Sequence, residues 1–424
     1  MKSRALLKIV SLTFLLTGTS SAREWKDSSG RVIQAEILGI ELGKVVVQFP
    51  DKRRAALPTG LLSETDRVWV EQWSQGKSPE QKLPPPVWPE AVKQPEIHVK
   101  TMAKEDRGWI FKSPHYDFTC DAEISVSVMN DFATVSEGCS LLMESLPIHF
   151  PRSEGKTFYA RIFQNREGYA RAGGPNGSGG VFMTADISGG GVLLVPFESL
   201  GIEQFGGRNT KGYDYKATVL IHEMVHQATA ELLLVMPKWV SEGLAEYGAN
   251  MTYRSGVFYL GERERLQSLR HRLETYEQLG RDFAARVPNG AASLPKSWVM
   301  RPSELMAKSD ETWNTAIGGR SAQMQLHRMY LSSMFLMYYF MHMADHGEAR
   351  RLRVYFDDIA EVSKFLRTNG REGILPTALR ARPRLTLEAI RTHFTSQLVK
   401  PETPEALDKD FLQRLATAGF RITE

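Results

Sequence analysis

A proline-rich stretch between Lys77 and Glu96 divides this chain of 424 residues into two parts with different hydrophobic patterns. Before it, short apolar runs alternate with turn residues, which is typical of β-strands. After it, a few strands are followed by long segments of helical periodicity. Because clustered prolines favour extended backbone over packed structure, we expect the stretch itself to be a linker. The length predicts two or three folding units.

The first residues form a separate segment. A basic start (Lys2, Arg4, Lys8), a short apolar core and small residues up to Ala22 are typical of a secretory signal peptide. We therefore expect export to the periplasm or out of the cell. The predicted division of the whole chain is a signal peptide at 1–22, a small β domain at 23–75, a linker at 76–107, a larger α+β domain at 108–400 and a C-terminal tail with a short helix at 401–424.

Composition excludes several classes of protein. The net charge is +4, and three of the positive charges lie in the signal peptide, so nothing indicates binding to nucleic acid. The most apolar later segment, 329–343, is shorter than the roughly 20 residues of a membrane span, so we expect none in the mature chain. Two cysteines, Cys120 and Cys139, exclude a disulfide scaffold and a cysteine-type zinc site, and whether they are bridged stays open.

The larger domain is predicted to begin with a modest sheet and continue as a helical half, an α+β fold. A glycine-dense segment, 173–180, is interpreted as a flexible hairpin tip, because it lacks the Gly-Lys-Ser/Thr ending of a phosphate-binding loop. We expect strands at 115–120, 157–163 and 191–195, and helices at 122–146, 215–235, 237–250, 263–280, 323–343 and 385–398.

His222 and His226 lie one helical turn apart in an apolar segment. On a helix this spacing places two imidazoles on one face, about 6 Å apart along the axis, within reach of one Zn²⁺. Glu223 follows the first histidine and can act as general base on a water molecule. Two histidines that only satisfy hydrogen bonds would give the same short pattern, so a third ligand is needed to distinguish the two. The next predicted helix offers Glu242 and Glu246.

These two helices, with His-Glu-x-x-His and then Trp239-x-x-Glu242-Gly243-x-Ala245, resemble those of the gluzincins. This class of zinc peptidases includes thermolysin and the alanyl aminopeptidases, and the chain is most similar to a bacterial group of exported gluzincin-like proteins. The resemblance covers roughly residues 116–360 and implies Zn²⁺ with Glu242 as third ligand.

The interval from His226 to Glu242 is a few residues shorter than is usual in gluzincins, and Glu246 also lies within reach. We favour Glu242 as the ligand because its Trp-x-x-Glu-Gly context matches the family pattern. Glu246 would then orient His222 or His226, since a metal-bound imidazole needs an acceptor for its other nitrogen.

The resemblance also implies a Tyr or His from the helical half that stabilises the oxyanion. Tyr330 is our choice, although a core aromatic would give the same pattern, and His327, Tyr338 and Tyr339 lie in the same region. We further expect the strand at 192–195 to be the sheet edge that pairs with an extended peptide, with a buried strand as the alternative.

The first β domain resembles the SH3-like homology domain first named from a yeast actin-patch adaptor. The segment Trp25–Arg31, the valines at 45–47 and the segment Leu61–Asp66 carry this similarity. It implies a small β barrel that serves as a binding or spacing module and contributes no catalytic residue. An envelope component or a protein is the candidate ligand.

The leading hypothesis is therefore an exported zinc metallopeptidase that acts on a peptide or protein substrate. One alternative is a catalytically silent gluzincin-like binding or scaffold protein of the cell envelope. The other is a zinc hydrolase of a non-peptide substrate, which would share all the site residues.

Overall fold

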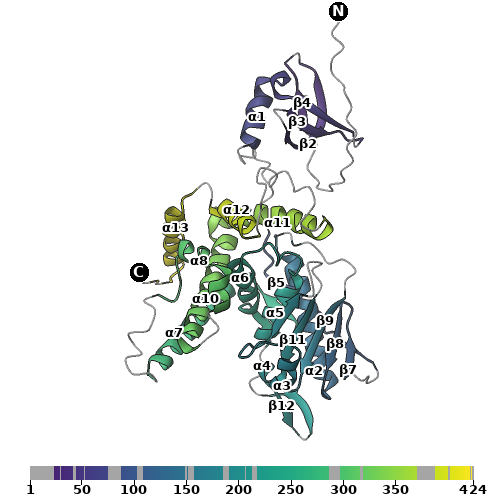
Figure 1. Ribbon diagram of the computed structural model, residues 1–424, viewed down its shortest axis with the longest axis vertical. Coiled ribbons are helices and arrows are strands. Elements are labelled where there is room, and N and C mark those ends of the chain that lie inside the picture. Colours follow the sequence, from purple (N-terminus) through teal and green to yellow (C-terminus); the bar gives the residue numbers. More distant parts are fainter. Residues whose placement is uncertain are drawn as a thin grey trace, which may run out of the picture. The chain divides into compact units, whose positions relative to one another are not determined.

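The computed structural model shows a mixed α+β protein, as predicted, with two compact units, residues 1–85 and 86–424 (Figure 1). The predicted signal peptide lies outside the described residues. The structure describes residues 23–28, 30–41, 44–51, 53–74, 87–102, 108–148, 150, 157–184, 191–205, 207–212, 217–285, 297–315, 319–369, 387–399, 402–420 and 422.

The first unit is an antiparallel sheet in the order β1-β2-β3-β4, followed by a short 3₁₀ turn and a helix. The expectation of a closed barrel is wrong for the described residues, because β1 and β4 are not paired. A single bridge from Asp27 to Leu62 joins the two ends, and the helix adds Val70 to the core. The elements are β1 (Arg23–Lys26), β2 (Val32–Glu41), β3 (Lys44–Gln48), β4 (Arg54–Pro58), η1 (Thr59–Leu61) and α1 (Glu64–Ser74).

The second unit contains a six-stranded sheet in the order β10-β11-β9-β8-β7-β6. The central strands β8, β9 and β11 are parallel and the others antiparallel. Successive side chains point to opposite faces, so α2 covers one face while α3 packs on the other. The elements are β6 (Lys100–Thr101), β7 (Trp109–Lys112), β8 (Tyr116–Cys120), α2 (Val126–Ser145), β9 (Phe158–Phe163), α3 (Arg166–Arg171), β10 (Val181–Thr184) and β11 (Gly191–Pro196).

This order corrects one expectation. The strand expected at the sheet edge, β11, lies between β10 and β9, and its inner residues are buried. The edge strand next to β11 is β10, and its sequence does not reveal it because its side chains are only partly buried and show no clear alternation. Cys120 and Cys139 are both buried and unbridged.

The predicted linker is partly folded. Strand β5 (Ala91–Lys93) pairs with β15 (Val257–Tyr259), which pairs in turn with β14 (Thr252–Arg254). Val92 of β5 is buried in the main core, and β6 belongs to the large sheet. The segment from residue 91 to 101 is therefore part of the second unit. The burial of Val92 and the pairing of β5 and β6 with other strands outweigh the effect of the prolines on either side of β5.

The helical half follows the sheet, and its predicted helices are found within a few residues of their expected ends, except that the helix expected to reach residue 235 ends at Ala228. The C-terminal tail is also part of this unit, since Leu407, Phe411 and Leu415 are buried. The elements are α4 (Phe197–Leu200), β12 (Ile202–Phe205), β13 (Arg208–Lys211), α5 (Thr218–Ala228), α6 (Lys238–Ala249), α7 (Glu262–Ala285), α8 (Pro302–Met306), α9 (Asp310–Thr315), α10 (Gly319–His342), η3 (Ala344–Gly347), α11 (Arg350–Asn369), α12 (Leu387–Val399) and α13 (Pro404–Thr417).

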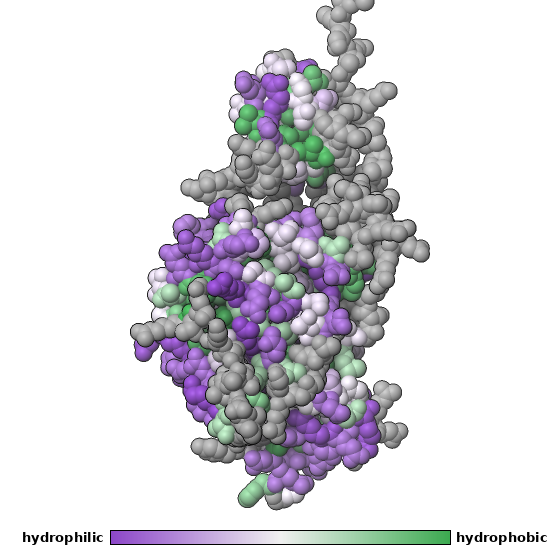
Figure 2. All heavy atoms as spheres, turned by 60° about the vertical axis from the view of Figure 1, so that its left-hand side comes forward, coloured by the Kyte–Doolittle hydropathy of each residue, from purple (hydrophilic) through white to green (hydrophobic). Residues whose placement is uncertain are grey.

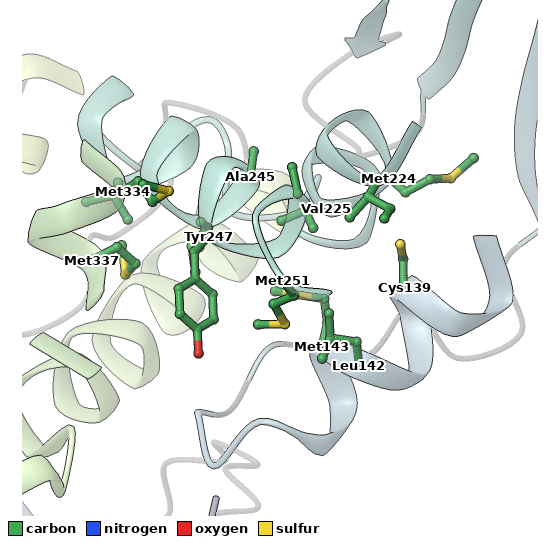
Figure 3. Close-up of a cluster of buried hydrophobic side chains, with 14 of the residues drawn as sticks. Cys139, Leu142, Met143, Met224, Val225, Ala245, Tyr247, Met251, Met334 and Met337 are labelled. Atoms are coloured by element: carbon green, nitrogen blue, oxygen red, sulfur yellow. The ribbon is translucent and has the colours of Figure 1, made fainter. Parts of the chain in front are cut away.

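Helix α6 is packed closely between α5 and α10. A Cβ at Gly243 would lie 2.6 Å from the carbonyl oxygen of Ser333 in α10, and one at Gly248 would lie 2.7 Å from a methyl carbon of Val225 in α5. Figure 3 shows side chains of α2, α5, α6 and α10 meeting in one buried apolar cluster. Gly243 therefore allows the close approach of α6 to α10, and Gly248 allows that of α6 to α5.

One face of the second unit is mostly polar. On the face shown in Figure 2, hydrophilic side chains cover most of the described part of the second unit, and hydrophobic ones occur in small groups. Within the described residues, none of the helices combines the length and apolar character needed to cross a membrane.

Candidate metal centre

Three side chains from α5 and α6 meet in a small triangle. The Nε2 atoms of His222 and His226 lie 3.2 Å apart, and Oε2 of Glu242 lies 3.3 Å from each of them. His222 and His226 come from one face of α5, and Glu242 comes from the first half of α6. All three side chains are largely buried, with exposed fractions between 9% and 15%.

These separations match those of a zinc site. Ligand atoms about 2.0–2.1 Å from a tetrahedral zinc ion are about 3.3 Å from one another. The three ligand atoms thus occupy three corners of such a tetrahedron, and two imidazole nitrogens with one carboxylate oxygen are a donor set that zinc accepts in catalytic sites. The residues therefore fit a zinc ion, which His222, His226 and Glu242 would hold.

The short connection between the two helices explains how Glu242 reaches the site. After Ala228 the chain makes a series of tight turns, with hydrogen bonds from Leu232 N to Thr229 O and from Met236 N to Leu232 O. Pro237 then precedes the first residue of α6. The interval of 16 residues from His226 to Glu242 is thus taken up by a compact turn instead of a loop.

Glu246 lies one turn further along α6 and contacts the other side of His222. Its Oε1 is 3.2 Å from Nδ1 of His222, and its Oε2 accepts a hydrogen bond from Arg272 at 2.6 Å. Glu242 therefore faces both Nε2 atoms, whereas Glu246 faces the far nitrogen of His222. This is the geometry expected of a carboxylate that orients a metal-bound imidazole.

Burial and neighbouring charges shift the pKa values of these groups. Burial alone would raise the pKa of Glu246, but its hydrogen bond from His222 and the charge of Arg272 lower it to about 2. The pKa of Glu242 is also held well below its usual range, because the charge of His226 and hydrogen bonds from both histidines outweigh burial. The pKa of His222 is raised well above its usual value, because hydrogen bonds to Glu242 and Glu246 outweigh burial. Both carboxylates are therefore ionised at neutral pH.

Glu223, the candidate general base, is fixed from the sheet side. Its Oε2 accepts a hydrogen bond from the backbone N–H of Phe182 in β10 at 2.8 Å. A Cβ at Gly180 would lie 3.1 Å from Cγ of Glu223, so the chain just before β10 packs directly on the glutamate side chain. The carboxylate of Glu223 therefore lies between the sheet edge and its own helix α5, which also carries His222 and His226 and is called the metal helix below.

The glycine-dense segment is a packed part of the site and not a free hairpin tip. The hydroxyl oxygens of Tyr169 in α3 and Ser178 are hydrogen-bonded at 2.6 Å. Arg166, also in α3, donates to the carbonyl oxygen of Ser178 at 2.5 Å. A Cβ at Gly179 would lie 3.2 Å from the Val219 side chain of α5. The interpretation as a flexible tip was wrong because contacts with α3 and α5 hold the segment, and these are not visible in sequence.

Of the four residues considered for oxyanion stabilisation, Tyr330 is the one with a described ring contact to the triangle. Its ring centroid is 6.1 Å from that of His222, and burial together with Glu242, Glu246 and Glu223 raises its pKa, so its hydroxyl keeps its proton. The described contacts of the other three are with different residues. His327 packs on Tyr276, Tyr338 packs on His342, and Tyr339 donates to Asp410.

Sequence reasoning missed two parts of the site. Arg272 is one of several arginines in α7, and nothing in the sequence distinguishes it from the others. The backbone N–H of Phe182 carries no sequence signal at all, although the glycines before it, Gly179 and Gly180, mark a place where two segments approach closely.

No family model, curated protein or solved structure matches this chain. The residues of the site and their geometry are therefore the basis for inferring its function.

Proposed function

We propose that this chain is an exported zinc metallopeptidase of the gluzincin type. The observation that supports it most is the triangle of His222, His226 and Glu242, whose ligand atoms have the mutual distances of a tetrahedral zinc site. A carboxylate suited to general-base catalysis, Glu223, follows the first of these ligands in sequence. The signal-peptide pattern of residues 1–22 supports the exported location in this proposal.

In the proposed reaction a water molecule is added across a peptide bond. Zinc held by the three ligands would acidify that water and polarise the carbonyl group that it attacks. Glu223 accepts one proton of the water as its oxygen bonds to the carbonyl carbon. It then passes this proton to the amide nitrogen as the C–N bond breaks. The protonated hydroxyl of Tyr330 donates to the carbonyl oxygen as negative charge develops there.

The substrate would lie along β10 in this proposal. This strand is at the edge of the described sheet, and its Phe182 N–H lies next to Glu223. An extended peptide that adds to a sheet edge is aligned by main-chain hydrogen bonds. Such a peptide on β10 would present its backbone to Glu223 and to the three ligands, which favours a peptide over a substrate without a regular backbone.

The test is hydrolysis of a peptide library by the purified, zinc-loaded mature chain. We expect Glu223→Gln to lower kcat/KM by about 10²- to 10⁴-fold, the usual contribution of a general base, with zinc content unchanged. Glu137→Gln is the matched control, since Glu137 is a buried glutamate that bonds only to Ser113 and His115 in its described contacts. Absence of hydrolysis in zinc-loaded wild type, or full activity of Glu223→Gln, would contradict the proposal.

The first unit would act as an SH3-like binding module for an envelope component or a protein. Its four-stranded antiparallel sheet, its buried Trp25 and the helix that follows support this proposal. Deletion of residues 23–75 is expected to leave hydrolysis of short peptides unchanged. A fall in that activity would contradict a separate binding role.

A further inference from the structure

Arg272 lies behind the candidate metal centre, on a helix that the sequence does not connect with it. Its Nη2 atom donates to Oε2 of Glu246 at 2.6 Å, and Oε1 of the same carboxylate is 3.2 Å from Nδ1 of His222. The side chain of Glu246 is only 7% exposed and that of Arg272 is 25% exposed. The three side chains thus form a continuous row of polar contacts from α7 to the candidate metal ligand His222.

The charges around the site indicate what this row of three side chains does. Glu223, Glu242 and Glu246 place three carboxylates close together in a largely buried region, and buried carboxylates need compensating charge. A divalent cation would offset two of the three negative charges, and Arg272 would offset the third. Lys238 approaches Glu242 at 3.9 Å, but its side chain is 46% exposed, so water weakens this pair.

Arg272 is also held in place itself. Its guanidinium carbon lies 5.0 Å from the ring centroid of Tyr276, one turn along α7. Stacking on an aromatic ring leaves the donors in the plane of the guanidinium directed sideways, toward Glu246. A compact lysine ammonium group would keep the charge but lose this orientation.

We propose that Arg272 is a positioning residue for the metal. It fixes the carboxylate of Glu246, which accepts the Nδ1–H of His222 and so directs Nε2 of that imidazole toward the ion. The inference rests on the metal site of the proposed function, and it assigns to α7 a role in zinc affinity.

The test is the zinc dissociation constant of the full mature chain, measured by competition with a chromophoric chelator. We expect Arg272→Gln and Glu246→Gln each to weaken zinc binding by about 10- to 100-fold, the usual effect of losing an outer partner of a ligand. Because Arg272 acts through Glu246, the double variant should bind zinc no more weakly than Glu246→Gln alone. Arg272→Lys should restore part of the affinity.

Arg270→Gln is the matched control, because Arg270 lies on the same helix and donates to the carbonyl oxygen of Ala418. It should bind zinc as wild type does. Wild-type affinity in Arg272→Gln, or effects of Arg272→Gln and Glu246→Gln that multiply in the double variant, would overturn this inference and leave the proposed function standing. If Arg272→Gln does not fold, Arg272→Lys with and without Glu246→Gln gives the same comparison. Failure of wild type to bind zinc would overturn both proposals.

Discussion

Two glutamates beside the metal ligands, Glu223 and Glu246, lie on opposite sides of the metal helix and are held in different ways. On the sheet side, Glu223 is held by a backbone N–H of Phe182 and by the close approach of Gly180. On the helical side, Glu246 is held by the side chains of His222 and Arg272. Side-chain contacts can be removed by shortening or neutralising a residue, whereas the backbone contact can be disturbed only by changing the space around it. Substitutions on the two sides should therefore have distinguishable effects.

The largest expected effect on the helical side is that of Tyr330→Phe. The ring would stay packed between His222 and Trp313, but the hydroxyl donor would be lost. If this hydroxyl stabilises the oxyanion, kcat should fall by about 10²- to 10³-fold, with KM and zinc content close to those of wild type. Steady-state kinetics on a peptide substrate measures the effect. Tyr338→Phe, which alters a tyrosine packed on His342, is the control, and an equal loss in both variants would rule out a specific role for Tyr330.

Gly180→Ala should have the next largest effect, and it tests the sheet side. The added Cβ would meet Cγ of Glu223 at 3.1 Å and the carbonyl oxygen of Leu194 at 3.3 Å, so the glutamate must shift. A shift of a few tenths of an ångström in a general base should lower kcat/KM by about 10- to 100-fold. Zinc affinity should stay unchanged, because it is set by the contacts on the helical side.

Gly179→Ala is the control for this substitution, because its Cβ would meet the methyl groups of Val219 at 3.2 Å and would have no glutamate atom nearer than 3.8 Å. We expect a smaller loss of activity. Loss of zinc in Gly180→Ala would show that the two sides are not separable in this way.

A smaller effect is expected on the stability of the metal-free protein at different pH values. The pKa of Glu246 is lowered to about 2, and that of Glu242 is also lowered. The contribution of both carboxylates to the free energy of unfolding is therefore complete above about pH 4.5 and is lost as pH falls through their folded-state pKa values. The pKa of His222 is raised, so its contribution is complete below about pH 6.5 and is lost as pH rises through the folded-state value. The free energy of unfolding should therefore be highest between these limits.

Denaturant unfolding in the presence of a chelator measures this dependence, and we expect a decrease of about 1–3 kcal/mol on either side of the maximum. Glu246→Gln should reduce the pH dependence on both the acid and the alkaline side of this maximum. It removes one carboxyl group with a lowered pKa and one hydrogen bond that raises the pKa of His222. An unchanged profile in this variant would contradict the assignment of the pH dependence to the helical side.

Much of the second unit could be predicted from its sequence, and the reason differs between elements. The metal helix and α6 have strong helical periodicity and carry their site residues as side chains, so His222, His226, Glu242 and Glu246 could be named in advance. The edge strand could not be identified, because β10 has four partly buried residues and its position depends on pairing with β11. Arg272 could not be distinguished from Arg270, since only tertiary packing decides which arginine faces Glu246.

Metal content of the purified mature chain tests the central claim most directly. We predict about one zinc per chain in wild type and its loss in both His222→Ala and Glu242→Ala, because each substitution leaves only two of the three protein ligands. Wild-type protein without zinc, after purification without chelators, would contradict the account. So would a Glu242→Ala variant that keeps its zinc, since Glu246 would then have to be the third ligand.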